Sequence, residues 1–274
     1  MPHITLSKGS THYELSGPES GRLVVLLHGG TIPMWTWDRQ VPALVDAGFR
    51  VLRYDMFGKG MSASPSGVYN RDLYRNQLLD LLNALEISTP FCLVGFSFGG
   101  ATATNFSAHH PERVERLALV APVVSFASGN WLVRAVRLRV IGAVILRQLV
   151  MKKALSRASR LWASAANKGH YSQLFARQMD IDGYEDAFLS FMRSDALEDY
   201  SNVYRQVGKM NLPVLLMWGT ADEDIPERHI RFVNQAVPQI EYCELPGISH
   251  GAVFQAPNEV NVELLRFLGS NKKE

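Results

Sequence analysis

Gly95-Phe96-Ser97-Phe98-Gly99 is the stretch of this chain that points most directly to a fold. It follows Pro90-Phe91-Cys92-Leu93-Val94, a run typical of a buried strand, and it precedes residues 100–109, which have a helical pattern. A serine at such a strand-to-helix turn is held on a strained bend with its hydroxyl exposed, and the flanking glycines leave room for that bend. This position suits a nucleophile and predicts a hydrolase. The motif occurs by chance in roughly one in ten chains of this length, so the surrounding sequence has to support it.

Strand-like and helical segments alternate along most of the chain. Residues 73–85 and 260–268 carry apolar residues at helical spacing. Such alternation predicts an α/β fold, with a mostly parallel sheet and helices on both of its faces. Residues 5–6 and 12–15 add a candidate antiparallel hairpin at one edge. Residues 22–27 form a continuous apolar run of the kind typical of a strand covered on both faces, and further candidate strands lie at residues 49–54, 91–96, 114–120, 213–218 and 240–245.

The alternation stops between Pro122 and about Gly208, where the pattern is helical throughout. We therefore predict an α/β core of residues 1–121 and 209–274, with residues 122–208 inserted as an all-helical cap. The expected place of the cap is over the carboxyl ends of the strands, where open α/β sheets bind their ligands.

The composition is that of an ordinary globular protein, with 274 residues, 47% hydrophobic and 20% charged. A net charge of +2 implies no general attraction to nucleic acid. The two cysteines, Cys92 and Cys243, lie in separate apolar runs and are predicted to be buried free thiols. Residues 1–10 contain no apolar signal core, and the longest apolar stretch, residues 140–146, is too short to span a bilayer. The expected location is the cytoplasm.

A serine nucleophile needs a neighbouring base, and the base needs an acid that orients it. In a sheet of this kind the acid follows the nucleophile in the chain and the histidine comes last. Asp222 lies just past the strand-like run 213–218 and is the preferred acid, with Asp224 as the alternative. His250 is the only histidine after the last strand-like run and is the expected base. Without this context, each aspartate is equally well explained as a solvent-exposed loop residue.

The developing negative charge of an acyl-transfer reaction needs two backbone N–H groups as an oxyanion hole. The residue after the nucleophile, Phe98, supplies one of them at the start of its helix. We expect the second from Gly30, in the His28-Gly29-Gly30 loop that follows the first buried strand. This reaction needs no metal ion and no organic cofactor. His28 itself is expected to hold the loop in place rather than to transfer protons.

Six segments together carry a family resemblance. They are His28-Gly29-Gly30, Asp55-Met56-Phe57-Gly58-Lys59-Gly60-Met61-Ser62, Gly95-Phe96-Ser97-Phe98-Gly99-Gly100, Pro111-Glu112-Arg113-Val114, Gly219-Thr220-Ala221-Asp222 and Ser249-His250. In this order and around a helical insertion, they resemble the α/β-hydrolase fold family of the Ser-His-Asp type. The resemblance implies a Ser97–His250–Asp222 triad. The segment from Asp55 to Ser62 resembles a structural turn of that family and is given no catalytic role.

The resemblance narrows the chemistry to a few classes. Haloalkane dehalogenases and epoxide hydrolases place an aspartate where Ser97 stands, and proline iminopeptidases carry a Pro-Gly pair that the Gly30 loop lacks. Carbon–carbon hydrolases of vinylogous diketones are closer, although they usually carry a tryptophan where Gly251 follows His250. Hydrolysis of a small-molecule carboxylic ester is therefore the leading interpretation. The alternatives are a carbon–carbon hydrolase and a non-catalytic binding protein of the same fold.

Aromatic side chains near the two oxyanion loops suggest an apolar pocket and an apolar acyl group. The expected wall residues are Trp35, Phe98 and Phe254.

The predicted cap contains an unusual basic segment. Residues 131–160 hold eight basic residues and no acidic ones, interleaved with apolar residues. A basic amphipathic helix can lie on an anionic membrane surface. The preferred interpretation is a cap helix with its apolar face on the pocket and its charges in water. The basic residues are Arg134, Arg137, Arg139, Arg147, Lys152, Lys153, Arg157 and Arg160.

Overall fold

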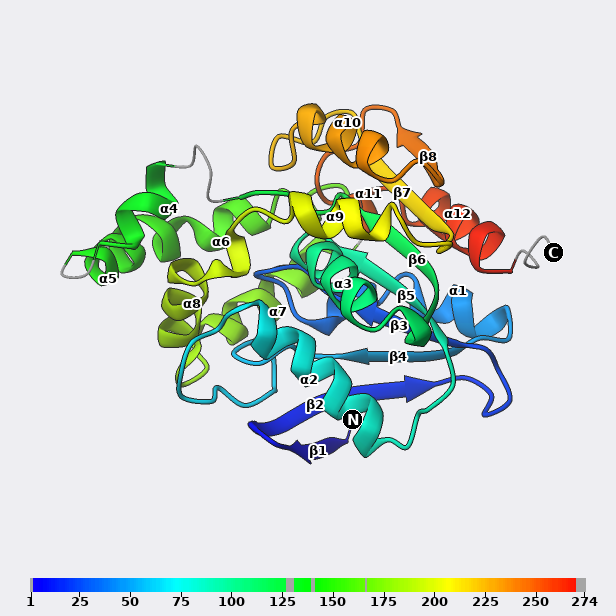
Figure 1. Ribbon diagram of the computed structural model, residues 1–274. Coiled ribbons are helices and arrows are strands. Elements are labelled where there is room, and N and C mark those ends of the chain that lie inside the picture. Colours follow the sequence, from blue (N-terminus) through cyan, green and yellow to red (C-terminus); the bar gives the residue numbers. More distant parts are fainter. Residues whose placement is uncertain (1, 127–130, 139–140, 166, 270–274) are drawn as a thin grey trace.

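The computed structural model describes residues 2–126, 131–138, 141–165 and 167–269. In this part of the chain, eight strands form one sheet in the order β1-β2-β4-β3-β5-β6-β7-β8 (Figure 1). The pairs β1–β2 and β2–β4 are antiparallel, and all the other pairs are parallel. The predicted α/β class and the antiparallel edge hairpin are confirmed. The strands are β1 (His3–Leu6), β2 (Gly9–Ser16), β3 (Leu23–Leu27), β4 (Arg50–Tyr54), β5 (Phe91–Phe96), β6 (Val114–Val120), β7 (Val214–Gly219) and β8 (Ile240–Leu245).

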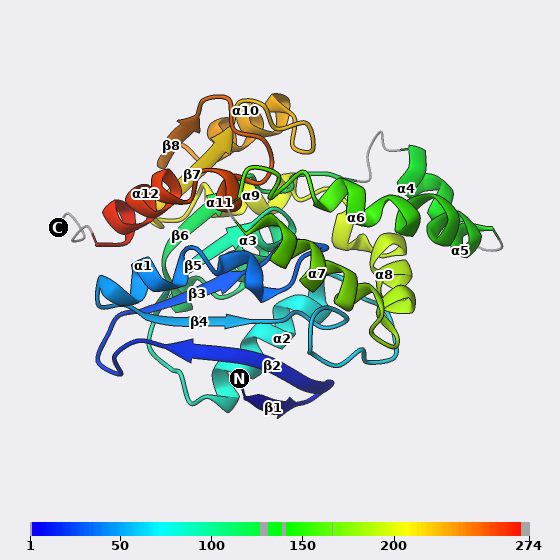
Figure 2. The same cartoon turned by 180° about the vertical axis from the view of Figure 1, so that it is seen from behind.

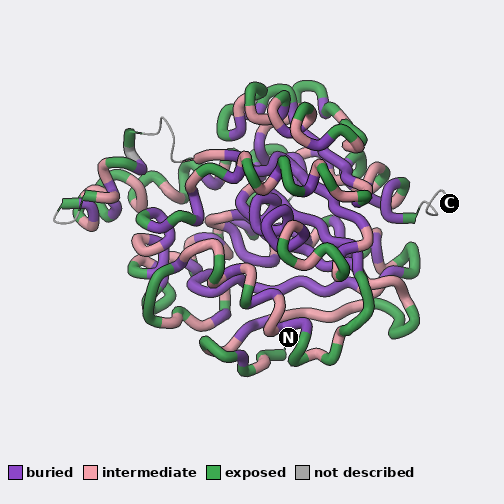
Figure 3. The backbone as a smooth tube through the Cα atoms, in the orientation of Figure 1, coloured by how far each residue is buried: buried purple, intermediate pink, exposed green. Residues whose placement is uncertain are grey.

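Helices cover both faces of the sheet. The helices α2 (Arg71–Ala84), α3 (Phe98–His109) and α9 (Ser201–Val207) lie on the face seen in Figure 1, and α10 (Glu227–Ala236) packs against α9. Figure 2 shows α1 (Val41–Asp46), α11 (Ala252–Gln255) and α12 (Pro257–Gly269) on the opposite face. The strands β5 and β7 are buried along their whole length, which explains why they are continuous apolar runs rather than alternating ones. In Figure 3 the buried segments concentrate in these strands and in α3.

Helices alone make up the described part of the chain between β6 and β7. They are α4 (Trp131–Val136), α5 (Gly142–Ile145), the π-helical turn η3 (Leu146–Met151), α6 (Lys152–Ala158), α7 (Lys168–Met179), α8 (Tyr184–Arg193), the 3-10 turn η4 (Asp195–Leu197) and α9. The helices α4, α5, α6 and α8 project beyond one end of the sheet (Figure 1). The last helix, α9, packs against α3 and α10 and therefore covers the sheet, although it falls within the predicted insertion.

None of the helices in the described part of the chain combines the length and the apolar character that a membrane-crossing segment needs. Cys92 and Cys243 are free thiols, as predicted; Cys92 is buried, whereas Cys243 is only half-buried, against the prediction.

Candidate active site

Ser97 occupies the turn between β5 and α3 in a strained conformation. Its φ of 55° and ψ of −119° lie where non-glycine residues are rare, at a cost of about 1–3 kcal/mol. A Cβ atom on Gly95 would stand 2.3 Å from the carbonyl oxygen of Gly99, and one on Gly99 would stand 2.3 Å from that of Leu27. Both positions therefore have to be glycine for β5, the turn and β3 to pack, which gives the Gly-x-Ser-x-Gly pattern a physical reason.

The structure brings Ser97, His250 and Asp222 together in a chain of hydrogen bonds. The Nδ1–H of His250 donates to Oδ2 of Asp222 over 2.8 Å, and Ser97 Oγ lies 3.0 Å from His250 Nε2. With the proton of the neutral ring on Nδ1, Nε2 accepts from the serine hydroxyl. This is the arrangement that a general base needs in order to activate a serine.

The loops after β7 and β8 are packed backbone to backbone, which sets the distance between the acid and the base. The amide of Ala221 donates to the carbonyl of Ile248 over 3.0 Å. The side chain of Asp222 is fully buried. Its Oδ1 accepts hydrogen bonds of 2.8 Å from the amides of Asp224 and Ile225, which leaves Oδ2 for His250. Asp224, the alternative acid, forms no hydrogen bond to His250.

The pKa of His250 is raised above its ordinary value. Burial lowers this pKa, but the hydrogen bond and the charge of Asp222, together with the charge of Asp224, outweigh burial. The imidazolium that forms when His250 takes a proton is therefore stabilised at the site.

The two expected oxyanion donors, Gly30 and Phe98, both line the same cavity as Ser97. Phe98 is the first residue of α3, so its N–H has no carbonyl partner within that helix. His28, just before Gly30, is fully buried, and burial lowers its pKa to about 4. Its Nδ1–H donates to the carbonyl of Gly29 over 2.7 Å, and its Nε2 accepts from the amide of Met56 over 2.9 Å. His28 is thus a neutral ring that fixes the glycine loop.

Asp55 organises the turn that follows β4. Its carboxylate accepts from the amides of Met34 and Met61 over 2.8 Å and 2.9 Å, and from His12 over 2.7 Å. These bonds occupy both oxygens inside the protein, which gives the turn a structural role.

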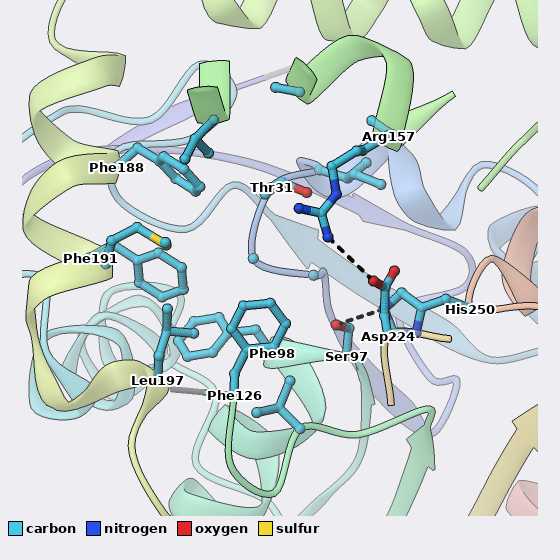
Figure 4. A pocket seen from close by; sticks show the side chains of 18 of the residues that line it. Thr31, Ser97, Phe98, Phe126, Arg157, Phe188, Phe191, Leu197, Asp224 and His250 are labelled. Carbon is cyan, nitrogen blue, oxygen red and sulfur yellow. Dashed lines mark hydrogen bonds and ion pairs between the residues drawn. The ribbon is translucent and has the colours of Figure 1, made fainter. Parts of the chain in front are cut away.

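A cavity of about 180 Å³ opens at Ser97 and His250. A single water needs only about 15 Å³, so this space is large enough for a substrate. Its wall is mainly apolar, and helices between β6 and β7 supply much of it (Figure 4). Thr31, from the loop after β3, and Ile225, from the loop after β7, line the cavity from the α/β core. The bulky apolar residues of the wall include Phe98, Phe126, Met151, Leu161, Phe175, Phe188, Phe191, Met192 and Leu197.

Phe98 lies in this wall as expected, whereas Trp35 and Phe254 do not. This corrects the sequence-based assignment of both residues to the pocket. Trp35 stacks on Tyr171 of α7 with 5.5 Å between ring centroids, and Phe254 meets Tyr171 edge-on at 5.1 Å. Trp162 completes the group at 5.6 Å from Trp35. The two rings join the sheet-bearing part of the molecule to the helical insertion, and neither of them lines the cavity.

Sequence reasoning missed a buried lysine behind the pocket wall. Lys59 donates to the hydroxyl of Tyr74 over 2.9 Å, and its Nζ lies 4.6 Å from the ring centroids of Tyr74 and Phe191. Burial lowers its pKa to about 7. Aromatic faces attract a cation, so Lys59 supports the rings that form the wall. Its place in a loop beside two glycines carried no signal of burial.

Residues 22–257 match the sequence model of the alpha/beta hydrolase fold family. The chain belongs to this family. Among curated relatives, the non-heme chloroperoxidase CPO-A1 of Kitasatospora aureofaciens is 27% identical over 90% of this chain and 92% of its own. The carboxylesterase YbfK of Bacillus subtilis is 24% identical over 97% of this chain and 86% of its own. Among solved structures, a thermophilic esterase from Thermogutta terrifontis has a TM-score of 0.82 at 19% identity, covering 98% of each chain.

Proposed function

We propose that this alpha/beta hydrolase cleaves carboxylic esters with apolar acyl groups through an acyl-enzyme on Ser97. The observation that carries the proposal is the hydrogen-bonded chain of Ser97, His250 and Asp222, of which Ser97 and His250 line an apolar cavity. Such a chain suits the activation of a serine, and the aromatic wall suits an apolar acyl group.

In this mechanism Ser97 Oγ attacks the ester carbonyl while His250 Nε2 takes its proton. Asp222 holds the ring in position and stabilises the imidazolium. The amides of Gly30 and Phe98 donate to the oxyanion of the tetrahedral intermediate. His250 then gives its proton to the departing alcohol. A water molecule, activated in the same way, releases the carboxylic acid from Ser97.

The geometry around Gly251 favours ester hydrolysis over carbon–carbon cleavage. A Cβ atom on Gly251 would stand 2.1 Å from the carbonyl oxygen of Leu161, in the helical insertion. A tryptophan after the histidine, usual in the carbon–carbon hydrolases that this chain resembles, has no room here. The contact between Ser97 and His250 also favours catalysis over ligand binding alone.

A panel of nitrophenyl esters of increasing acyl length, assayed beside a vinylogous diketone, tests the reaction class. We expect turnover of the esters, a preference for apolar acyl chains over acetyl, and little or no cleavage of the diketone. Faster turnover of the diketone would replace the proposed function with carbon–carbon hydrolysis. Turnover of neither substrate would favour a binding protein.

We further propose that α4 to α8 act as the cap of the site and that the outer surface of the cap contacts anionic membranes. Eleven large apolar side chains are exposed in the described part of the chain, and six of them lie between Trp131 and Leu155. Arg134, Lys152 and Lys153 are exposed nearby and pair with no described acid, while Arg147 pairs with Glu185. The six side chains are those of Trp131, Leu138, Ile141, Val144, Leu149 and Leu155.

One helical run presents both this surface and the pocket wall. The exposed residues Val144 and Leu149 lie in α5 and in the π-helical η3 of this run. Val150 and Ala154 in the same run line the cavity instead. Apolar residues next to unpaired cations fit an anionic bilayer surface. Of the predicted basic residues, Arg139 lies outside the described residues.

Co-sedimentation with phosphatidylserine vesicles tests the membrane contact. We expect binding at low salt that weakens as salt rises, because salt screens the attraction. Val144→Glu should reduce binding. Val262→Glu should not, because Val262 is equally exposed (63% against 59%) but lies on α12. The absence of binding at low salt, or equal effects of the two variants, would contradict the proposal.

A further inference from the structure

Two opposite charges meet across the cavity beside the catalytic histidine. Arg157 belongs to α6, and Asp224 belongs to the loop after β7 (Figure 4). The Arg157 Nη2 atom lies 3.8 Å from Asp224 Oδ1. Among the described residues of the cavity wall, Arg157 is the only arginine or lysine and Asp224 is the only carboxylate. The wall of the apolar pocket therefore carries one pair of opposite charges, and the two charges sum to zero.

Both groups have hydrogen-bonding capacity to spare. A separation of 3.8 Å is too long for a hydrogen bond, and the two side chains are 55% and 43% exposed. The guanidinium of Arg157 donates to no other described residue. Arg137 of the same insertion differs, because it donates to the carbonyls of Met192 and Ser194 and pairs with Glu198. A solvated ion pair contributes little to stability, so a ligand can share or displace it at low cost.

Arg157 and Asp224 lie on the side of Ser97 where the leaving alcohol has to be placed. His250 hands its proton to the departing alcohol, so that alcohol has to lie on the His250 side of Ser97. Asp224 lies close enough to His250 to raise its pKa. In Figure 4 the labelled rings of Phe188 and Phe191 lie on the other side of Ser97. An acyl group among these rings directs the alcohol of the ester toward Arg157 and Asp224.

The chemistry of the pair selects the kind of alcohol. Arg157 offers only N–H donors and Asp224 only acceptor oxygens. A charged alcohol would be attracted by one of the two groups and repelled by the other, so the pair gives no net attraction to either sign. A plain alkyl alcohol would displace the water that solvates both groups, and it would replace none of the hydrogen bonds that this water makes. A neutral alcohol with further hydroxyls fits both groups, because one hydroxyl oxygen accepts from Arg157 while another O–H donates to Asp224.

We propose that Arg157 and Asp224 form a subsite for a neutral polyhydroxylated leaving group, and that the substrates are esters of apolar acids with glycerol-like alcohols. The inference rests on the proposed ester hydrolysis. It adds the identity of the alcohol to that of the acyl group.

The test compares the glyceryl monoester and the propyl ester of one apolar acid, which share the acyl group and the three-carbon alcohol skeleton. Wild-type protein is expected to have the higher kcat/KM for the glyceryl ester. Arg157→Gln should lower the glyceryl-to-propyl ratio by about tenfold, the usual effect of losing a hydrogen bond to a charged group. Arg160→Gln is the matched control, because Arg160 lies outside the cavity wall and should leave the ratio unchanged.

The Asp224→Asn variant provides a second test. Its substrate is the ester of the same apolar acid with the hydroxyl of glycolate, so the leaving alcohol carries a carboxylate. Without the charge of Asp224, Arg157 should accept this anion, so the glycolate-to-propyl ratio should rise by about tenfold or more. The use of ratios cancels the effect of Asp224 on the pKa of His250. The subsite is refuted if wild-type protein turns over both esters equally well, or if Arg157→Gln lowers both to the same extent. If wild-type protein turned over none of these esters, the proposed function itself would be refuted.

Discussion

Ser97→Ala is expected to reduce ester turnover by about 10⁶-fold while leaving the thermal unfolding midpoint nearly unchanged. The loss follows because no other described nucleophile lies within reach of His250 Nε2. The midpoint should hold because alanine keeps the contacts of Gly95 and Gly99 and removes one hydrogen bond of 3.0 Å. Activity is measured with the best ester of the panel, and the midpoint by circular dichroism.

Ser107→Ala is the matched control for this variant. Ser107 lies within α3, the helix that begins directly after Ser97; its hydroxyl donates to the carbonyl of Ala103, and it does not line the cavity. This control should keep its activity. Substantial ester turnover by a clean preparation of Ser97→Ala would show that Ser97 is not the nucleophile.

Asp222→Asn is expected to lower kcat by about 10⁴-fold, because an amide can present an N–H to His250 and favour the wrong tautomer of the ring. Asp224→Asn should cost far less, since Asp224 forms no hydrogen bond to His250. Its effect should appear in the pH profile of kcat/KM. His250 has to be neutral to accept a proton, so activity falls as the pH drops through the pKa of His250. The charge of Asp224 raises that pKa, and its removal should move the acid limb to lower pH.

Steady-state kinetics of both variants between pH 5 and pH 9 would measure these effects, over the range in which a histidine titrates. A larger loss of kcat in Asp224→Asn than in Asp222→Asn would make Asp224 the catalytic acid. An acid limb that moves to higher pH in Asp224→Asn would contradict the electrostatic account of His250.

The fold was predictable because local patterns and chain order carry it. A strand covered on both faces has to be apolar throughout, and β5 begins and ends where its apolar run does. The same order placed an acid after β7 and a histidine after β8, where the structure joins them by a hydrogen bond. The choice between Asp222 and Asp224 depended on their distance from the end of the strand.

The pocket wall was less predictable because side chains from distant elements build it. In α8, Tyr184, Phe188 and Phe191 have the spacing of one apolar helix face, but spacing does not reveal what that face covers. Trp35 was assigned to the pocket because it follows the glycine loop in the sequence. Its ring instead packs on Tyr171, which is more than a hundred residues away. Such contacts depend on tertiary packing, which a local pattern does not encode.

Mass spectrometry after treatment with a fluorophosphonate shows whether Ser97 is an activated nucleophile. Such a reagent forms a stable bond only with a serine that a neighbouring base activates. We expect the addition of one reagent molecule per chain, located on the peptide that contains Ser97. We also expect no addition to Ser97→Ala and greatly slowed addition to a His250→Ala variant. Labelling of a different serine, or no labelling of folded wild-type protein, would contradict this role of Ser97.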